Sequence, residues 1–148
     1  GTVYRQTMFD EFEKMIHDEA VKGKALTAER LSSLYHHLNS YYYGDQITVD
    51  SEIDLEWARI PHFYYNYYIY QYATGFASAI SISQKILQEG TSVVDQYIRF
   101  LSKGSSDYPI PVLKKAGVDM TGSQPIEDAM RLFNQLLSEL ERLMNEST

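Results

Sequence analysis

The chain lacks cysteine altogether and lacks any long apolar run among its 148 residues. The first absence excludes disulfides, thiolate metal sites and a cysteine nucleophile, and it fits a reducing compartment, so we expect a cytoplasmic protein. The second leaves nothing near the roughly 20 apolar residues that a membrane-spanning helix needs. Residues 1–5 also lack the apolar core of a signal peptide. We therefore expect a soluble protein without a membrane partner.

Positive charge is scarce too, with 13 Lys and Arg against 20 Asp and Glu and a formal net charge of −7. No cluster of Lys and Arg could neutralise a row of phosphates, so nucleic acid is not expected as a partner. The remaining composition, 44% hydrophobic and 22% charged, is that of an ordinary globular protein. Its length suits one compact domain, residues 1–148.

Helical periodicity runs along nearly the whole chain, with apolar residues three and four apart. Thr27 can cap a helix that Gly44 ends, and Pro61 can open a long helix that Gly90 ends. Between them, we expect residues 45–54 to form a loop. The expected helical segments are 5–22, 28–43, 62–89, 93–101 with Ser92 as its cap, 112–116 and 125–144, followed by a frayed tail over 145–148. The sequence thus predicts an all-α fold, a single multi-helix domain.

Tyrosine is over-represented: there are 13, and six lie between Tyr64 and Tyr72. A tyrosine has a large apolar ring and a hydroxyl that needs a partner when buried, so the cluster favours an interface or a binding groove. On one continuous helix, His62, Tyr65, Ile69, Tyr72 and Phe76 would share one face, and Tyr64, Tyr67, Tyr68, Gln71 and Gly75 the next. Two interpretations stay open. One is an aromatic core stripe; the other is a groove whose phenols and imidazole donate hydrogen bonds to a peptide carbonyl or an oxyanion.

Other candidate chemistry is sparse. The His-Glu-x-x-His pattern of zinc peptidases is absent. Glu13 and His17 stand four apart, and we interpret them as an exposed pair, with the acidic run ending at Glu13 as surface charge near the start of a helix. Glu11 is an alternative candidate for a carboxylate that faces a groove. His36 and His37 are adjacent on a helix and point apart, so they cannot share one ion, and no metal site is expected.

Six short segments stand out in a fixed order. They are Arg5-Gln6-Thr7-Met8-Phe9-x-x-Phe12-Glu13, Gly23-x-x-Leu26-Thr27, Tyr42-Tyr43-Gly44, Trp57-Ala58-Arg59-Ile60-Pro61-His62-Phe63-Tyr64, Tyr70-Gln71-Tyr72-Ala73-Thr74-Gly75 and Ala116-Gly117-Val118-Asp119. This ordered set covers almost the whole chain and resembles consecutive landmarks of the oligoendopeptidase F family, in the thimet-oligopeptidase clan of zinc metallopeptidases. The resemblance implies a helical zincin-type endopeptidase that takes short, unstructured peptides into a deep channel and hydrolyses an internal bond.

In that family the metal ligands, a His-Glu-x-x-His pair and a more distant glutamate, lie upstream of the region resembled here. The resemblance therefore implies that residues 1–148 are the C-terminal portion of the catalytic domain. Zinc and the catalytic glutamate would belong to the upstream part of the same peptidase. The chain alone would then be inactive and would supply one wall of the groove for an oligopeptide substrate.

The resemblance also implies residue roles. His62, in its Pro-His-Phe context, matches a family histidine that donates a hydrogen bond to the oxyanion. Tyr72 is the first candidate for the matching tyrosine, and Tyr68 is the second. The expected substrate contacts are Tyr64, Tyr67 and Tyr70.

Two further hypotheses compete with this one. The chain could be a non-catalytic helical module that holds a peptide or protein with its tyrosine-rich face. It could also be a structural remainder whose groove face has collapsed or self-associated. An exposed aromatic face is an association liability, so we expect some self-association through it.

Overall fold

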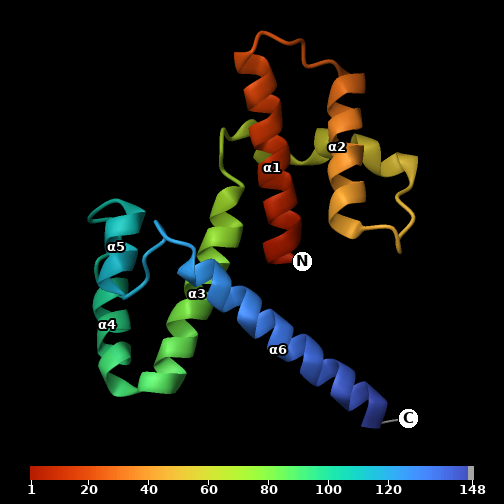
Figure 1. Cartoon of the computed structure of the whole chain (residues 1–148). Helices are drawn as coiled ribbons and strands as arrows, with labels where there is room; N and C mark the ends of the chain where they lie inside the picture. The colour runs from red at the N-terminus through yellow and green to blue at the C-terminus, as the bar shows by residue number, and fades with distance from the viewer. Residues whose placement is uncertain (147–148) are drawn as a thin grey trace. The chain divides into compact units, whose positions relative to one another are not determined.

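The structure, a computed structural model that describes residues 1–146, contains helices and no strand within that range (Figure 1). Its elements are α1 (Thr2–Val21), α2 (Ala28–Tyr43), the 3-10 helices η1 (Ser51–Arg59) and η2 (Pro61–Tyr64), α3 (Tyr70–Glu89), α4 (Thr91–Leu101), α5 (Pro109–Lys115) and α6 (Gln124–Glu146). The predicted all-α class is confirmed. The predicted fraying is wrong for Asn145 and Glu146, which continue α6, and residues 147–148 lie outside the described part.

The chain divides into two compact units, one over Gly1–Ala73 and one that begins at Thr74. Each unit has its own cluster of buried apolar side chains. The assignment of residues 1–148 to a single domain stays a prediction.

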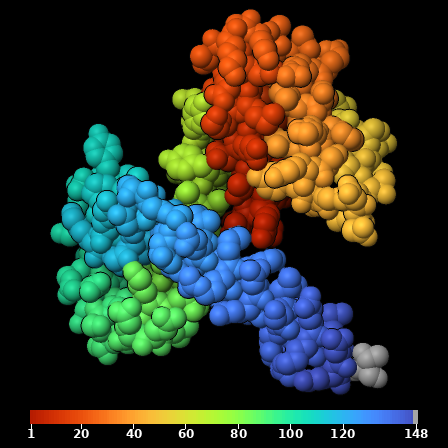
Figure 2. All heavy atoms as spheres, in the orientation of Figure 1, coloured from red at the N-terminus to blue at the C-terminus, as the bar shows by residue number. Residues whose placement is uncertain are grey.

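The first unit is built on a hairpin of α1 and α2, whose atoms pack side by side (Figures 1 and 2). The predicted cap is confirmed, since the Thr27 hydroxyl accepts the Arg30 backbone N–H at 3.2 Å. Gly44 ends α2 with a φ of 69°, which a residue with a side chain adopts only with strain. The core of this unit consists of Met8, Phe9, Phe12, Leu34, Tyr35, Leu38, Ile60 and Ile69.

The segment predicted to be a loop, 45–54, is partly helical, because η1 begins at Ser51. Ile53 and Trp57 of η1 pack against the core, and the Trp57 indole N–H donates to the Ser32 hydroxyl at 3.2 Å. Tertiary burial therefore stabilises a short helix whose mixed Asp, Ser and Thr composition had indicated a loop.

The prediction of one long helix over residues 62–89 is also wrong. The chain forms η2 at residues 61–64, runs without helix through residues 65–69, and enters α3 only at Tyr70. Asn66 and Tyr67 have φ values of 51° and 58°, which lie in the left-handed region, so a right-handed helix cannot pass through them. The two helical faces expected for the tyrosine cluster do not exist as such.

The second unit consists of most of α3 with α4, α5 and α6. Its buried cluster is Ile82, Ala116 and Val118, against which Ile86, Tyr97, Phe100 and Met120 pack. Two polar contacts add to it, since the Lys85 ammonium donates to the Gly117 carbonyl and the Ser81 hydroxyl donates to Asp128 of α6 at 3.3 Å. The helices α4, α5 and α6 start earlier than predicted, by two residues for α4, by three for α5 and by one for α6. Gly90, and not Ser92, is the N-cap of α4.

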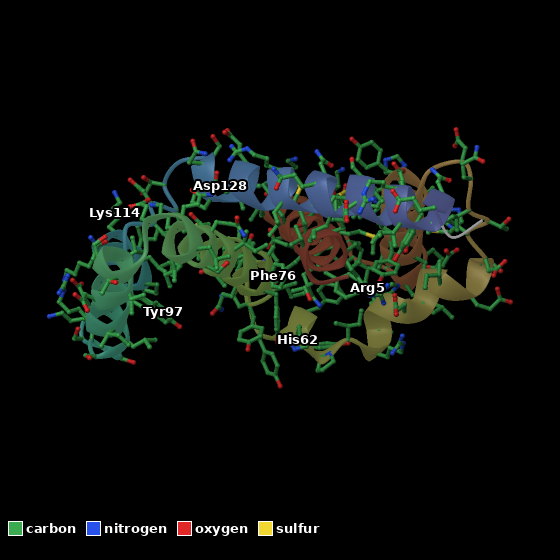
Figure 3. The ribbon with its side chains drawn as sticks, turned by 90° about the horizontal axis from the view of Figure 1, so that it is seen from below. Arg5, His62, Phe76, Tyr97, Lys114 and Asp128 are labelled. Atoms are coloured by element: carbon green, nitrogen blue, oxygen red, sulfur yellow. The ribbon has the colours of Figure 1, made fainter. Side chains whose placement is uncertain are left out.

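A buried carboxylate ties η1 to both helices of the hairpin. Glu56 is 6% exposed and accepts hydrogen bonds from Arg5 at 2.6 Å, from the Tyr35 hydroxyl at 2.7 Å and from Arg59 at 2.5 Å. Figure 3 shows Arg5 directed from α1 toward η1. Burial, together with Glu56, raises the pKa of Tyr35 far above its usual value. The phenol therefore stays neutral and remains a donor.

Replacing Glu56→Ala should lower the free energy of unfolding by about 3 kcal/mol, because it leaves the Tyr35 hydroxyl and the Arg5 guanidinium without their acceptor. Equilibrium urea unfolding measures this loss. Glu52→Ala is the matched control on η1, since Glu52 is exposed and should cost no more than about 0.5 kcal/mol. Similar losses for the two variants would contradict the account.

A second carboxylate clamps the turn between α1 and α2. Glu19, 9% exposed, accepts hydrogen bonds from Arg30 at 2.6 and 2.8 Å and from Lys24 at 2.8 Å. These hydrogen bonds lower the pKa of Glu19 from the ordinary 4.5 to about 2, and the bond from Arg30 has the largest effect. As the pH falls, the unfolded chain binds the Glu19 proton before the folded chain does.

The stabilisation from Glu19 should therefore be complete above pH 4.5 and disappear as the pH falls toward 2. Thermal unfolding of the wild type and of Glu19→Gln across this range checks the sign. The gap between the two melting temperatures should be widest above pH 4.5 and should narrow with acid. A gap that is constant with pH would show that Glu19 is not held as the charged form.

Candidate functional site

Four aromatic rings meet where the chain passes from η2 into α3. The His62 Nε2 lies 3.2 Å from the Tyr72 hydroxyl. The Tyr68 ring stacks on the His62 ring with centroids 5.5 Å apart and planes 3° from parallel, and the Tyr65 ring meets His62 edge-on at 6.4 Å. We call His62, Tyr65, Tyr68 and Tyr72 the histidine–tyrosine cluster. Figure 3 labels His62 at this place.

The cluster lies at the surface. His62 is partly buried, while Tyr72, Tyr68 and Tyr65 are 36%, 38% and 62% exposed. An imidazole and a phenol that share a hydrogen bond can both turn their polar atoms to an incoming acceptor. Which of the two donates in the free protein depends on the His62 tautomer. The arrangement therefore suits hydrogen bonding to a carbonyl oxygen or an oxyanion.

The neighbouring ring also affects the Tyr72 phenol. A hydrogen bond with Tyr68 raises the pKa of Tyr72 above its usual value, and desolvation adds a smaller effect in the same direction. Tyr72 is thus neutral near pH 7 and keeps the proton that a donor needs.

The structure brings together the residues predicted as transition-state donors, His62, Tyr68 and Tyr72. They do not share one helical face, because the chain between His62 and Tyr70 is not a continuous helix. Tyr65, for which no role was predicted, joins them.

The residues predicted as substrate contacts lie at three different places. The Tyr64 hydroxyl donates to the Ala58 carbonyl at 3.4 Å, and its ring is 70% exposed. The Tyr67 ring stacks on His17 of α1 with centroids 4.4 Å apart. Tyr70 begins α3 and is 47% exposed. Their role in binding peptide stays a prediction.

One important residue was misread from the sequence. Glu13 was interpreted as exposed, but it is fully buried, and its Oε1 accepts the Tyr67 backbone N–H. Its Oε2 is buried without a hydrogen-bond partner among the described residues. The burial of Glu13 could have been inferred from the spacing of the apolar residues, because Phe9, Phe12 and Ile16 place it on the core face of α1.

Two other polar residues considered from the sequence, Glu11 and His36, have side-chain partners in the first unit. The Glu11 carboxylate accepts the Tyr42 hydroxyl at 2.9 Å, and the His36 Nδ1 lies 2.6 Å from an Asp54 oxygen. Over residues 1–146, no group of three or more His, Asp and Glu side chains could hold a metal ion. This part of the chain therefore does not fit a zinc site.

Among the helices of residues 1–146, none combines the length and the apolar character that crossing a bilayer requires.

Comparison with known proteins gives a consistent set of matches. The sequence model of Peptidase family M3 matches residues 1–132. Oligopeptidase PepF of Bacillus subtilis (strain 168) is 58% identical over 97% of this chain and 22% of that protein. The plasmid oligoendopeptidase F of Lactococcus lactis subsp. cremoris is 47% identical over 99% of this chain and 24% of that protein.

A solved structure agrees with these matches. The crystal structure of oligoendopeptidase-F from Enterococcus faecium superposes with a TM-score of 0.95 at 53% identity, over 99% of this chain and 28% of that one. The chain thus spans about a quarter of the length of these relatives.

Within the histidine–tyrosine cluster, Tyr68→Phe should lower the pKa of Tyr72 toward the ordinary tyrosine value of about 10, because the raising hydrogen bond is lost. Titration of 13Cζ-labelled tyrosine by NMR measures it, and Tyr72→Phe identifies the signal. Tyr41→Phe, a change at a 75% exposed phenol of α2, should leave that signal unchanged. A Tyr72 pKa that is the same with and without the Tyr68 hydroxyl would rule out this coupling.

Proposed function

Because this chain belongs to peptidase family M3, we propose that it forms one wall of the peptide-binding groove in a zinc endopeptidase that hydrolyses short oligopeptides. In this proposal the rest of the enzyme holds the zinc and the catalytic glutamate. That division is consistent with the lack of a fitting metal site in residues 1–146. The enzyme would act in the cytoplasm, which suits a chain without cysteine.

The observation that supports this role most directly is the contact between His62 and Tyr72. When a peptide bond is attacked, its carbonyl oxygen gains negative charge, and donors already aimed at that oxygen stabilise the transition state. The His62 Nε2 and the Tyr72 hydroxyl lie 3.2 Å apart, close enough for one oxygen atom to reach both. We assign these two groups as donors to the oxyanion.

Tyr68 has a supporting part in the same proposal. Its ring lies parallel to the imidazole and limits the rotation of His62 about its side-chain bonds. Tyr68 is also 38% exposed, so part of its side chain faces solvent. We assign Tyr64, Tyr67 and Tyr70 as contacts to the peptide outside the reacting bond. Their exposed rings, at 70%, 42% and 47%, offer apolar area to a bound peptide.

A non-catalytic peptide-binding module is the second candidate. The exposure of all six tyrosines between Tyr64 and Tyr72 favours it, because aromatic surfaces of this kind also serve in recognition without chemistry. The same exposure supports self-association through this face. The two candidates differ in whether His62 affects turnover or only binding.

The test uses a hybrid enzyme, the Enterococcus faecium oligoendopeptidase-F in which this chain replaces the matching segment. The hybrid should cleave an internally quenched oligopeptide in a buffer with zinc. His62→Ala and Tyr72→Phe should each lower kcat by about 100-fold, the typical loss for one oxyanion donor. Tyr41→Phe is the matched phenol control on α2 and should leave kcat unchanged.

Three outcomes would contradict the proposal in different ways. A hybrid that melts like the parent enzyme but does not cleave would show that this chain cannot form the wall. If that inactive hybrid still binds peptide, the binding module is favoured. An active hybrid whose kcat is unaffected by His62→Ala would show that His62 is not a donor to the oxyanion.

A further inference from the structure

The five residues that join η2 to α3 contain the chain's unusual backbone. Asn66 and Tyr67 are the non-glycine residues with positive φ in the described structure. Asparagine enters this region with little difficulty, whereas a bulky tyrosine rarely does. Such a conformation persists only when surrounding contacts hold it.

Those contacts come from α1. The buried Glu13 carboxylate accepts the Tyr67 N–H, and one turn later His17 stacks on the Tyr67 ring at 4.4 Å. Core packing fixes both ends of the segment, since Phe63 meets Phe12 edge-on at 5.1 Å and Ile69 is fully buried. Contacts with α1 and with the core therefore hold the Tyr67 backbone, the Tyr67 ring and both ends of the segment.

Burying Glu13 to provide one hydrogen-bond acceptor lowers the stability of the fold. Glu13 is fully buried, and its second oxygen has no hydrogen-bond partner among the described residues. A buried carboxylate with an unpaired oxygen lowers stability, and an apolar side chain at this core position would avoid that cost. An arrangement that breaks a packing rule in this way is expected beside a functional site.

The turn at Tyr67 is also what makes the cluster. On a continuous helix, six residues separate His62 from Tyr68 by about 9 Å of rise and by about 240° of rotation, so their rings could not stack. In the structure those rings are parallel, with centroids 5.5 Å apart. The break between η2 and α3 thus brings the imidazole and the phenols together.

We propose that Glu13 is a positioning residue of the peptidase, whose carboxylate holds the left-handed turn at Tyr67 and so places His62 and Tyr68 for the reaction. The proposal rests on the function proposed above. Glu13 itself is buried and does not reach the substrate; it acts through the backbone of Tyr67.

In the hybrid enzyme, Glu13→Ala should lower kcat by about 100-fold, because displacing transition-state donors by about 1 Å costs that much. Glu13→Gln keeps an oxygen that can accept the Tyr67 N–H and should retain most of the activity. Equal losses in the two variants would overturn the claim that the acceptor is what matters.

Glu19→Ala is the matched control, because Glu19 is a 9% exposed carboxylate six residues further along α1 that pairs with Lys24 and Arg30. It should lower the melting temperature and leave kcat unchanged at 25 °C, where the hybrid stays folded. If Glu19→Ala and Glu13→Ala lower kcat alike, Glu13 has a merely structural role and the proposal fails.

A spectroscopic measurement separates this proposal from the proposed function. 3-Fluorotyrosine placed at position 68 of the hybrid reports the ring current of His62 through its 19F shift. His62→Ala gives the shift of the unstacked ring, and Glu13→Ala should move the resonance to that value. An inactive hybrid that still shows this change would refute the function but support the positioning role. A resonance unmoved by Glu13→Ala would refute the positioning role even in an active hybrid.

Discussion

The hydrogen bond from the Tyr67 backbone to the buried Glu13 carboxylate is the contact on which the candidate site depends. It joins residues 54 positions apart in sequence and ends a helical segment that local sequence would have continued. The consequence is a turn that stacks Tyr68 on His62 and leaves Tyr72 within 3.2 Å of the same imidazole. The site is thus made by the end of one helix and the start of the next.

This contact requires α1 to be held firmly, and the first unit shows how that is done. The aromatic core around Phe12 and Tyr35, whose rings meet edge-on at 5.1 Å, fixes α1 against α2. Glu56 ties η1 to the same two helices, and Glu19 fixes the turn between them. Each of these carboxylates is paired with donors, whereas Glu13 keeps one oxygen unpaired. The difference is consistent with a structural role for the first two and a functional one for Glu13.

The parts of the fold that local chemistry determines could be predicted from sequence. Thr27 and Gly44 bound α2 because a cap and a left-handed stop need only neighbouring residues. The break before Tyr70 could not be predicted, because it depends on a distant carboxylate. The burial of Glu13 could have been inferred, since it occupies a core position in the apolar stripe of α1. Roles at the reacting bond were expected for His62, Tyr68 and Tyr72 through resemblance to a family. Helical spacing had placed Tyr65 beside His62 on a continuous helix, whereas the structure brings the two rings together across the break in that helix.

In the proposed function, His62 and Tyr72 face the oxyanion of a peptide bond under attack. The most direct measurement is a crystal structure of the hybrid enzyme with a phosphinic peptide, whose tetrahedral phosphinyl group mimics that transition state. We expect one phosphinyl oxygen within about 3 Å of both the His62 imidazole and the Tyr72 hydroxyl. A bound inhibitor whose oxygens are held by other groups, with the contact between His62 and Tyr72 unchanged, would contradict it.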